Sequence, residues 1–172
     1  MKKAIIILFI TLMLAASSQA QKFAFVDTEY ILNNIPAYKA AKEQLDQLSE
    51  TWQKEVEVQF ADVEQMYKAY QAEAVLLSDE MKRKREEGIV AKEKEAKELQ
   101  KKYFGREGDL FKKRQELVKP IQDEVFNAVK ELAVEGNYNA IFDTASSGLS
   151  MLYTDPKFDK SDEVLKKLGY GQ

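Results

Sequence analysis

The sequence predicts a mainly α-helical protein with a small β part, in which a long antiparallel helical coiled-coil hairpin projects from a small α/β body. Three observations lead to this prediction. Among the 172 residues, 45% are apolar and 32% are charged, and there are only seven glycines and three prolines, a composition typical of a folded chain. Residues 37–87 contain neither glycine nor proline. Apolar side chains recur in this stretch at a helical spacing.

Residues 1–20 have the pattern of a secretory signal peptide. Lys2 and Lys3 form a basic start, residues 4–16 form an apolar run, and small residues lead up to Ala20. We therefore expect cleavage between Ala20 and Gln21, and export of the remaining chain. An uncleaved membrane anchor is the alternative, but the apolar run is short for a span, which needs about 20 residues. A lipoprotein is excluded because the chain has no cysteine to carry the lipid.

The residue types of most enzyme sites are missing. The chain has neither cysteine nor histidine, which excludes disulfides, thiolate catalysis and the usual zinc clusters. No phosphate loop, dinucleotide fingerprint or serine-hydrolase elbow occurs. The polar stretch from Asp143 to Ser147 is interpreted as a strand end followed by a turn rather than as a nucleophile cluster. We therefore expect no enzyme, no cofactor and no metal site.

The charges argue against a nucleic-acid partner. After removal of the signal peptide, 24 basic and 29 acidic residues give a net charge of −5, whereas nucleic-acid binders usually have a strongly basic face. The charges are also unevenly distributed. Residues 37–78 carry 4 basic and 8 acidic side chains, and residues 79–116 carry 13 basic and 10 acidic ones. The two halves of the predicted hairpin therefore have opposite net charge.

The first elements after the signal peptide are short. Phe23 to Val26 is an aromatic and β-branched run that predicts a strand. Asp27 or Thr28 can cap a short helical turn through Leu32, and the chain then breaks at residues 33–36, which end in a proline.

The first arm of the hairpin carries a narrow apolar stripe. Its apolar residues follow one another at steps of three and four, with a mean of about 3.55, which is typical of a coiled coil. They are Tyr38, Ala41, Leu45, Leu48, Trp52, Val56, Phe60, Val63, Tyr67, Tyr70, Ala74 and Leu77. The aromatic members and the neighbouring Met66 either pack in this stripe or offer a surface to apolar partners.

The second arm keeps a seven-residue apolar repeat but contains three glycines. The repeat consists of Ile89, Ala96, Tyr103, Leu110 and Leu117. Gly88, Gly105 and Gly108 each cost about 1 kcal/mol relative to alanine in a helix interior, so this arm should be softer than the first.

The tip of the hairpin is predicted near residues 76–82. Ser78 precedes an acidic first turn, as an N-capping residue does. Pro36 and Pro120 each lie 42 residues from it, so two equal arms would bring both prolines to the same end. A tip at Gly88 is the alternative, with arms of 52 and 32 residues. With the tip near residues 76–82, the hairpin would comprise residues 37–117.

Residues 21–36 and 118–172 remain for the body. An amphipathic helix runs from Ile121 to Leu132, and a last helix capped by Asp159 or Ser161 ends at Leu168. Between them, residues 138–143 and 150–153 are predicted to be strands that pair as a hairpin. A body of 71 residues has a small core and exposed strand edges, so we expect it to oligomerise.

A basic cluster follows the predicted tip, formed by Lys82, Arg83, Lys84 and Arg85. It either contacts an anionic lipid surface or acidic segments of a bound protein, or it is a solvated surface balanced by nearby glutamates.

The order of these parts resembles the Skp, or OmpH-like, family of periplasmic chaperones of Gram-negative bacteria. The resemblance covers nearly all of the chain after residue 20. It is carried by residues 22–27, 119–125, 138–143, 152–153 and 159–168. One feature departs from the family, because its better-known members are strongly basic whereas this chain is acidic after residue 20.

The resemblance implies a periplasmic homotrimer. Strands of three subunits would form a shared body, and three hairpins would surround a cavity that holds unfolded outer-membrane β-barrel proteins without ATP. The body candidates are Phe23, Phe25, Ile141, Phe142, Leu152 and Tyr153. The candidates for client contact are Met66, Tyr67, Tyr70, Lys82, Arg83, Lys84 and Arg85. Lipopolysaccharide or an anionic lipid surface is a further partner class to test, and a coiled-coil adaptor that docks one fixed partner is the alternative function.

Overall fold

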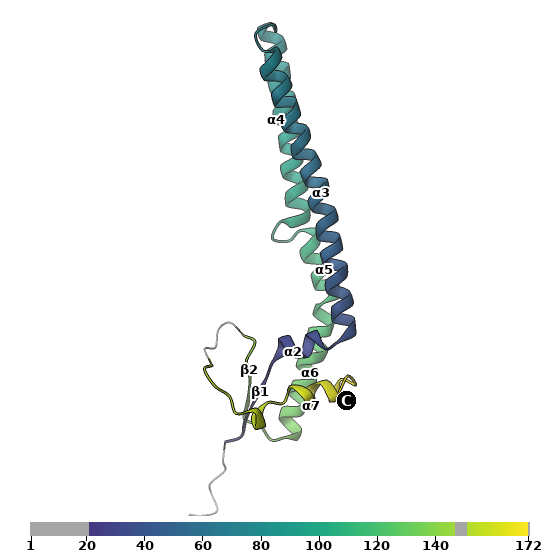
Figure 1. Cartoon of the computed structure of the whole chain (residues 1–172), viewed down its shortest axis with the longest axis vertical. Coiled ribbons are helices and arrows are strands. Elements are labelled where there is room, and N and C mark those ends of the chain that lie inside the picture. The colour runs from purple at the N-terminus through teal and green to yellow at the C-terminus, as the bar shows by residue number, and fades with distance from the viewer. Residues whose placement is uncertain (1–20, 147–150, 172) are drawn as a thin grey trace, which may run out of the picture. The chain divides into compact units, whose positions relative to one another are not determined.

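The computed structural model describes residues 21–146 and 151–171 (Figure 1). The mainly helical fold with a small β part is confirmed. In chain order the elements are β1 (Phe23–Val26), α2 (Thr28–Asn33), α3 (Pro36–Glu73), α4 (Asp79–Phe104), α5 (Asp109–Leu117), α6 (Lys119–Glu135), β2 (Ala140–Asp143), the 3-10 helix η1 (Pro156–Phe158) and α7 (Ser161–Lys167). The predicted signal peptide with Ala20 lies outside the described residues, and Gln21 is exposed.

Two compact units make up the chain. One consists of residues 32–125, and we call it the hairpin unit; the other combines residues 21–31 with the described part of 126–172, and we call it the body unit. The predicted division lies after residues 36 and 117, whereas these units divide after residues 31 and 125.

In the hairpin unit, α3 forms the first arm, and α4 and α5 together form the return arm. The two arms lie side by side and run in opposite directions (Figure 1). Proline occupies the start of α3, where its fixed backbone angle suits the first helical turn. Residues 74–78 connect the arms, and the Ser78 hydroxyl accepts a hydrogen bond of 3.3 Å from the Met81 N–H. Ser78 is therefore the N-cap of α4.

Apolar packing along this hairpin is concentrated at a few levels. Val56 and Ala96 are buried between the two long helices. At the other end from the connection, a cluster of Ala41, Leu45 and Val118 is covered by Tyr38, Leu110, Leu117 and Ile121. The stripe that the sequence predicts in the first arm is thus buried only at some of its positions.

The return arm is interrupted, whereas the sequence predicted a soft but continuous arm. We call residues 105–108 the glycine turn. The Gly105 N–H donates to the Lys101 carbonyl, and the Gly108 N–H donates to the Gly105 carbonyl, each at 2.8 Å. A side chain at Gly105 would place its Cβ 2.3 Å from the Lys101 carbonyl oxygen, so close backbone approach requires glycine here. Of the three glycines of the return arm, only Gly88 lies inside a helix.

The body unit contains a parallel sheet of two strands, and the predicted antiparallel strand hairpin is wrong. β2 pairs with β1 in the register Phe23 to Ala140 through Val26 to Asp143. The Asn139 N–H donates to the Lys22 carbonyl and the Thr144 N–H to the Val26 carbonyl, which fixes both ends of the pair. Residues 151–153 form no strand, and residues 147–150 lie outside the described part of the chain.

A hydrogen-bond network joins the ends of the body elements. The Thr28 hydroxyl donates to Asp143 at 2.7 Å, and the Asp27 N–H donates to the buried Ser161 hydroxyl at 2.8 Å. Asp159 accepts from the Ser161 N–H at the start of α7. The core beneath consists of Ala24, Val26, Ile31, Ala128, Val164 and Leu165.

Candidate functional site

The hairpin is the first candidate surface, and aromatic contacts fix its register. The rings of Trp52 and Tyr103 are stacked, with centroids 4.9 Å apart and planes 6° from parallel. The Tyr103 hydroxyl donates to Glu55 at 2.6 Å, and the Tyr70 hydroxyl donates to Glu86 nearer the connection. Each of these contacts joins the two arms, so they align α3 against α4.

The same two hydrogen bonds change the acidity of the tyrosines. Donation to the Glu86 carboxylate raises the pKa of Tyr70, and donation to Glu55 raises the pKa of Tyr103. Both hydroxyls are therefore protonated at neutral pH, and both can donate.

The predicted contact residues of the first arm divide between the seam of the two helices and the surface. Met66 is half-buried, and its Cε lies 3.8 Å from the position that a Gly88 Cβ would take. Tyr70 is half-buried as well, whereas Tyr67 is 52% exposed. Of the three, only Tyr67 offers most of its side chain to a partner.

The connection between the arms is more apolar than the sequence analysis expected. Val75 is 91% exposed and Leu76 is 87% exposed, although both follow directly on the apolar stripe of α3. From the sequence, a basic cluster was predicted after the tip, and Val75 was not singled out. The signal was present, because Val75 to Leu77 are three apolar residues in a row at a predicted turn.

The basic cluster is only partly neutralised. Arg85 forms an ion pair with Glu73 at 3.1 Å, and Lys82 lies 3.9 Å from Asp79. Arg83 and Lys84 are exposed and make no ion pair within the described residues. These two are the members of the cluster that remain available to a partner.

Other exposed apolar side chains occur at intervals along both arms and were not singled out from the sequence. They are Val58 on α3, Met81 and Val90 on α4, and Phe111 on α5, each between 45% and 64% exposed. The arrangement suits many separate weak contacts.

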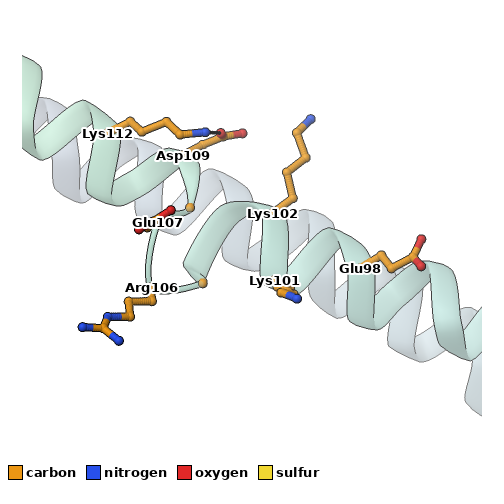
Figure 2. A pocket seen from close by; sticks show the side chains of 9 residues that line it. Glu98, Lys101, Lys102, Arg106, Glu107, Asp109 and Lys112 are labelled. Carbon is orange, nitrogen blue, oxygen red and sulfur yellow. Dashed lines mark ion pairs between the residues drawn. The ribbon is translucent and has the colours of Figure 1, made fainter.

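A hollow of about 500 Å³ lies beside the glycine turn (Figure 2). Lys101 and Lys102 line it from the end of α4, and Arg106 projects from the turn away from both helices (Figure 2). Lys112 pairs with Asp109 at 3.6 Å across the start of α5. The hollow is an open, charged depression on the surface of the return arm.

The body unit has a second candidate surface, formed by apolar side chains of the sheet. The Phe142 ring lies 6.1 Å from that of Phe23 and 5.8 Å from that of Phe25. Phe23 is 40% exposed, and Phe25, Phe142 and Ile141 are half-buried. The three phenylalanines are therefore together on one face of the sheet, and Ile141, which precedes Phe142 on β2, lies on the other face.

The other predicted body residues do not pack against the described chain. Leu152 is fully exposed and Tyr153 is 79% exposed. Phe126 and Val134 on α6, which the sequence analysis did not select, are 68% and 72% exposed. Within the described residues, β2 has a partner strand on one edge only.

The described residues lack two features that would point to other functions. No helix among them is long and apolar enough to cross a membrane. They also contain no group of three or more carboxylates that could hold a metal ion.

Comparison with known proteins identifies the family. Residues 22–168 match the model of the family described as outer membrane protein (OmpH-like). This chain belongs to the OmpH-like family. It is 31% identical over 156 residues to an uncharacterized protein of Aquifex aeolicus (strain VF5), covering 91% of each chain. The OmpH-like fold recurs in a crystal structure from Caulobacter crescentus CB15, a candidate outer membrane chaperone (OmpH-like), with a TM-score of 0.63, 12% identity, and coverage of 88% of this chain and 86% of that one.

Proposed function

We propose that this OmpH-like protein is an ATP-independent holdase, a chaperone that binds unfolded outer-membrane β-barrel proteins and prevents their aggregation. It acts in the periplasm as a homotrimer and has no catalytic activity. The observation that carries the proposal is the set of exposed apolar side chains spread over the hairpin of a family member. Clients are enclosed between three hairpins until they reach the outer membrane.

Dispersed contacts suit a client without fixed structure. Fully burying one valine or leucine side chain contributes about 1.5–3 kcal/mol, so each partly covered contact is weak and exchanges readily. Val58, Tyr67 and Val75 are at separate levels of the hairpin, and several of them can engage one chain at the same time. Many such contacts keep an unfolded chain soluble without selecting one sequence.

The surface of the body unit supports the trimer. A two-stranded sheet is marginal on its own, and β2 leaves an edge that a strand of another subunit can extend. Leu152 and Tyr153 are exposed apolar side chains close in sequence to this strand. We expect them to be buried between subunits.

Light scattering of residues 21–172 with an outer-membrane barrel protein diluted from urea tests the proposal. We expect a trimer that keeps the barrel protein soluble in one discrete complex, at low and at high salt and without ATP. A protein of monomer mass, or a trimer that lets the barrel protein precipitate, would contradict it.

Matched variants locate the client contacts. Val58→Ser, Tyr67→Ser and Val90→Ser together should weaken protection against aggregation several-fold. The control replaces the exposed polar residues Gln53, Gln65 and Gln100 of the same two helices by serine and should protect like the parent. Equal protection by both triple variants would place the client elsewhere.

A second pair of variants tests the trimer. Leu152→Asp with Tyr153→Asp should yield a folded monomer, because two carboxylates would be buried between subunits. Ser146→Asp, at an exposed position after β2, should remain a trimer. A trimer that survives the double substitution would exclude these side chains from the interface.

The adaptor function is the second candidate, and the exposure of Val75 and Leu76 favours it. An adaptor would dock one partner at this connection. Val75→Ser with Leu76→Ser would then abolish binding altogether, whereas a holdase would lose only one of several contacts. Retention of most client protection by the double variant argues for the holdase.

A further inference from the structure

The outer faces of the two arms carry stripes of opposite charge. On α3, the exposed residues Glu43, Asp46, Glu50, Glu57 and Glu64 follow one another at steps of three, four, seven and seven. Glu50 is two residues from Trp52, so this stripe lies on the side of the helix away from α4. We call these five residues the acidic stripe.

The return arm carries a stripe of basic residues on its outer face. Arg83, Lys94, Lys97 and Lys101 are exposed on α4, and Lys101 is two residues from Tyr103, so they lie on the side away from α3. We call these four residues the basic stripe. A shallow hollow of about 410 Å³ along this face is lined by three of the lysines, by the exposed Val90, and by Glu93 and Glu98, which pair with Lys97 and Lys94.

The charges of the two stripes are not used to join the arms of one chain. Most ion pairs of the hairpin run within one helix, such as Lys54 with Glu50 and Lys97 with Glu93. Among the described residues, Arg85 with Glu73 is the only ion pair between the arms. Pairs within one exposed helix are weak and exchange readily, so the stripes remain available to another molecule.

The stripes overlap in level over part of their length, where Glu57 and Glu64 face the range of the basic stripe. Counting in opposite directions from the stacked Trp52 and Tyr103 places Glu57 beside Glu98 and Glu64 beside Ala91. Lys94 and Lys97 of the basic stripe therefore lie between the levels of Glu57 and Glu64 of the acidic stripe. In a ring of identical copies, the same levels of neighbouring hairpins face one another.

We propose that the acidic stripe of one copy binds the basic stripe of the next copy, so that the hairpins close on one another when no client is present. This inference rests on the proposed trimer. A head-to-tail ring needs two different, complementary faces on each copy, and each hairpin offers one on either side. Salt opens the ring by screening, and an acidic client segment opens it by competing for the basic stripe.

Spin labels at the connection measure the closure. The chain has no cysteine, so Val75→Cys gives one label per copy, and pulsed electron resonance gives the distances between copies. Between about 20 mM and about 500 mM salt the screening length falls from roughly 20 Å to roughly 4 Å. We expect the population of short distances to fall at least about two-fold across this range.

Charge reversal provides the matched control. In the labelled protein at low salt, Lys94→Glu with Lys101→Glu should remove the short distances. Lys84→Glu with Lys102→Glu makes the same change in net charge off the stripe and should retain them. Adding Glu57→Lys and Glu64→Lys to the first variant should restore closure, which separates a lost contact from a misfolded arm.

The outcomes separate this inference from the proposed function. A trimer by light scattering whose distances do not respond to salt or to Lys94→Glu with Lys101→Glu overturns the closure alone. Loss of client binding in that variant with unchanged distances would assign the basic stripe to the client, and also overturns it. A monomer overturns both the closure and the proposed function.

Discussion

Two glycines of the return arm are expected to respond in opposite directions when each is replaced by alanine. Gly88 lies inside α4, and an added Cβ would meet only Met66 Cε, at 3.8 Å, an ordinary contact. Alanine is about 1 kcal/mol more favourable than glycine in a helix interior. Gly88→Ala should therefore raise the free energy of unfolding by about 1 kcal/mol.

Gly105→Ala should instead lower the free energy of unfolding. Its Cβ would lie 2.3 Å from the Lys101 carbonyl oxygen, the same atom that accepts the Gly105 N–H. The backbone must shift to make room, and overpacking of this kind costs about 1–3 kcal/mol. The glycine turn and the last turn of α4 would both be disturbed.

Urea unfolding followed by circular dichroism measures both effects. Protein concentration must be held constant, because the stability of the proposed trimer would depend on it. A stabilised Gly105→Ala protein would refute the reasoning, since it would mean that the glycine turn converts to helix at little cost. A destabilised Gly88→Ala protein would refute the position of Gly88 in the interior of the α4 helix.

The range of barrel sizes that the protein captures should depend on Gly88 rather than on the glycines of the glycine turn. A soft return arm, as predicted from the sequence, would be stiffened by alanine at Gly88, Gly105 and Gly108 together, which would narrow the range of captured barrels. The structure limits that expectation to Gly88, because the other two form the glycine turn. We expect Gly88→Ala to reduce capture of large barrels relative to small ones of about 8 strands. An unchanged range would mean that the arm does not adapt to client size.

Two further predictions concern the contacts between the arms. Trp52→Leu should lower the free energy of unfolding by about 1 kcal/mol through loss of the stacked pair with Tyr103, measured by urea unfolding. The pKa values of Tyr70 and Tyr103 are raised in the folded state. The stability that these two hydroxyls contribute is therefore complete below the ordinary tyrosine pKa, and it is lost as pH rises through the raised values. Stability should thus be level up to about pH 9 and fall above about pH 10, and Tyr70→Phe with Tyr103→Phe should reduce that fall.

The helices could be predicted because their signals are local. Residues 37–87 lack glycine and proline, and Ser78 before Asp79 and Glu80 marks a helix start, which the structure places there. The β1 run and the last helix follow from equally local patterns. Each of these elements is decided by a few neighbouring residues.

The errors arose where distant contacts decide the conformation. The turn signals after Asp143 favoured a local strand hairpin, but the hydrogen bonds of Lys22 and Val26 pair β2 with β1 instead. The glycine turn was missed because the seven-residue repeat continues across it from Tyr103 to Leu110. A repeat records which side chains face the other arm, and it does not require the backbone between them to stay helical.

The acidic net charge of residues 21–172 does not by itself oppose capture of acidic clients. Exposed apolar side chains occur on both arms, with Val58 and Tyr67 on the acidic one and Val90 and Phe111 on the basic one. Apolar burial is not weakened by screening, whereas attraction between charged stripes falls once the screening length drops below the separation of the charges. Client protection that persists at high salt, together with hairpin distances that lengthen, is therefore the combination that would assign capture to apolar contacts and closure to charge.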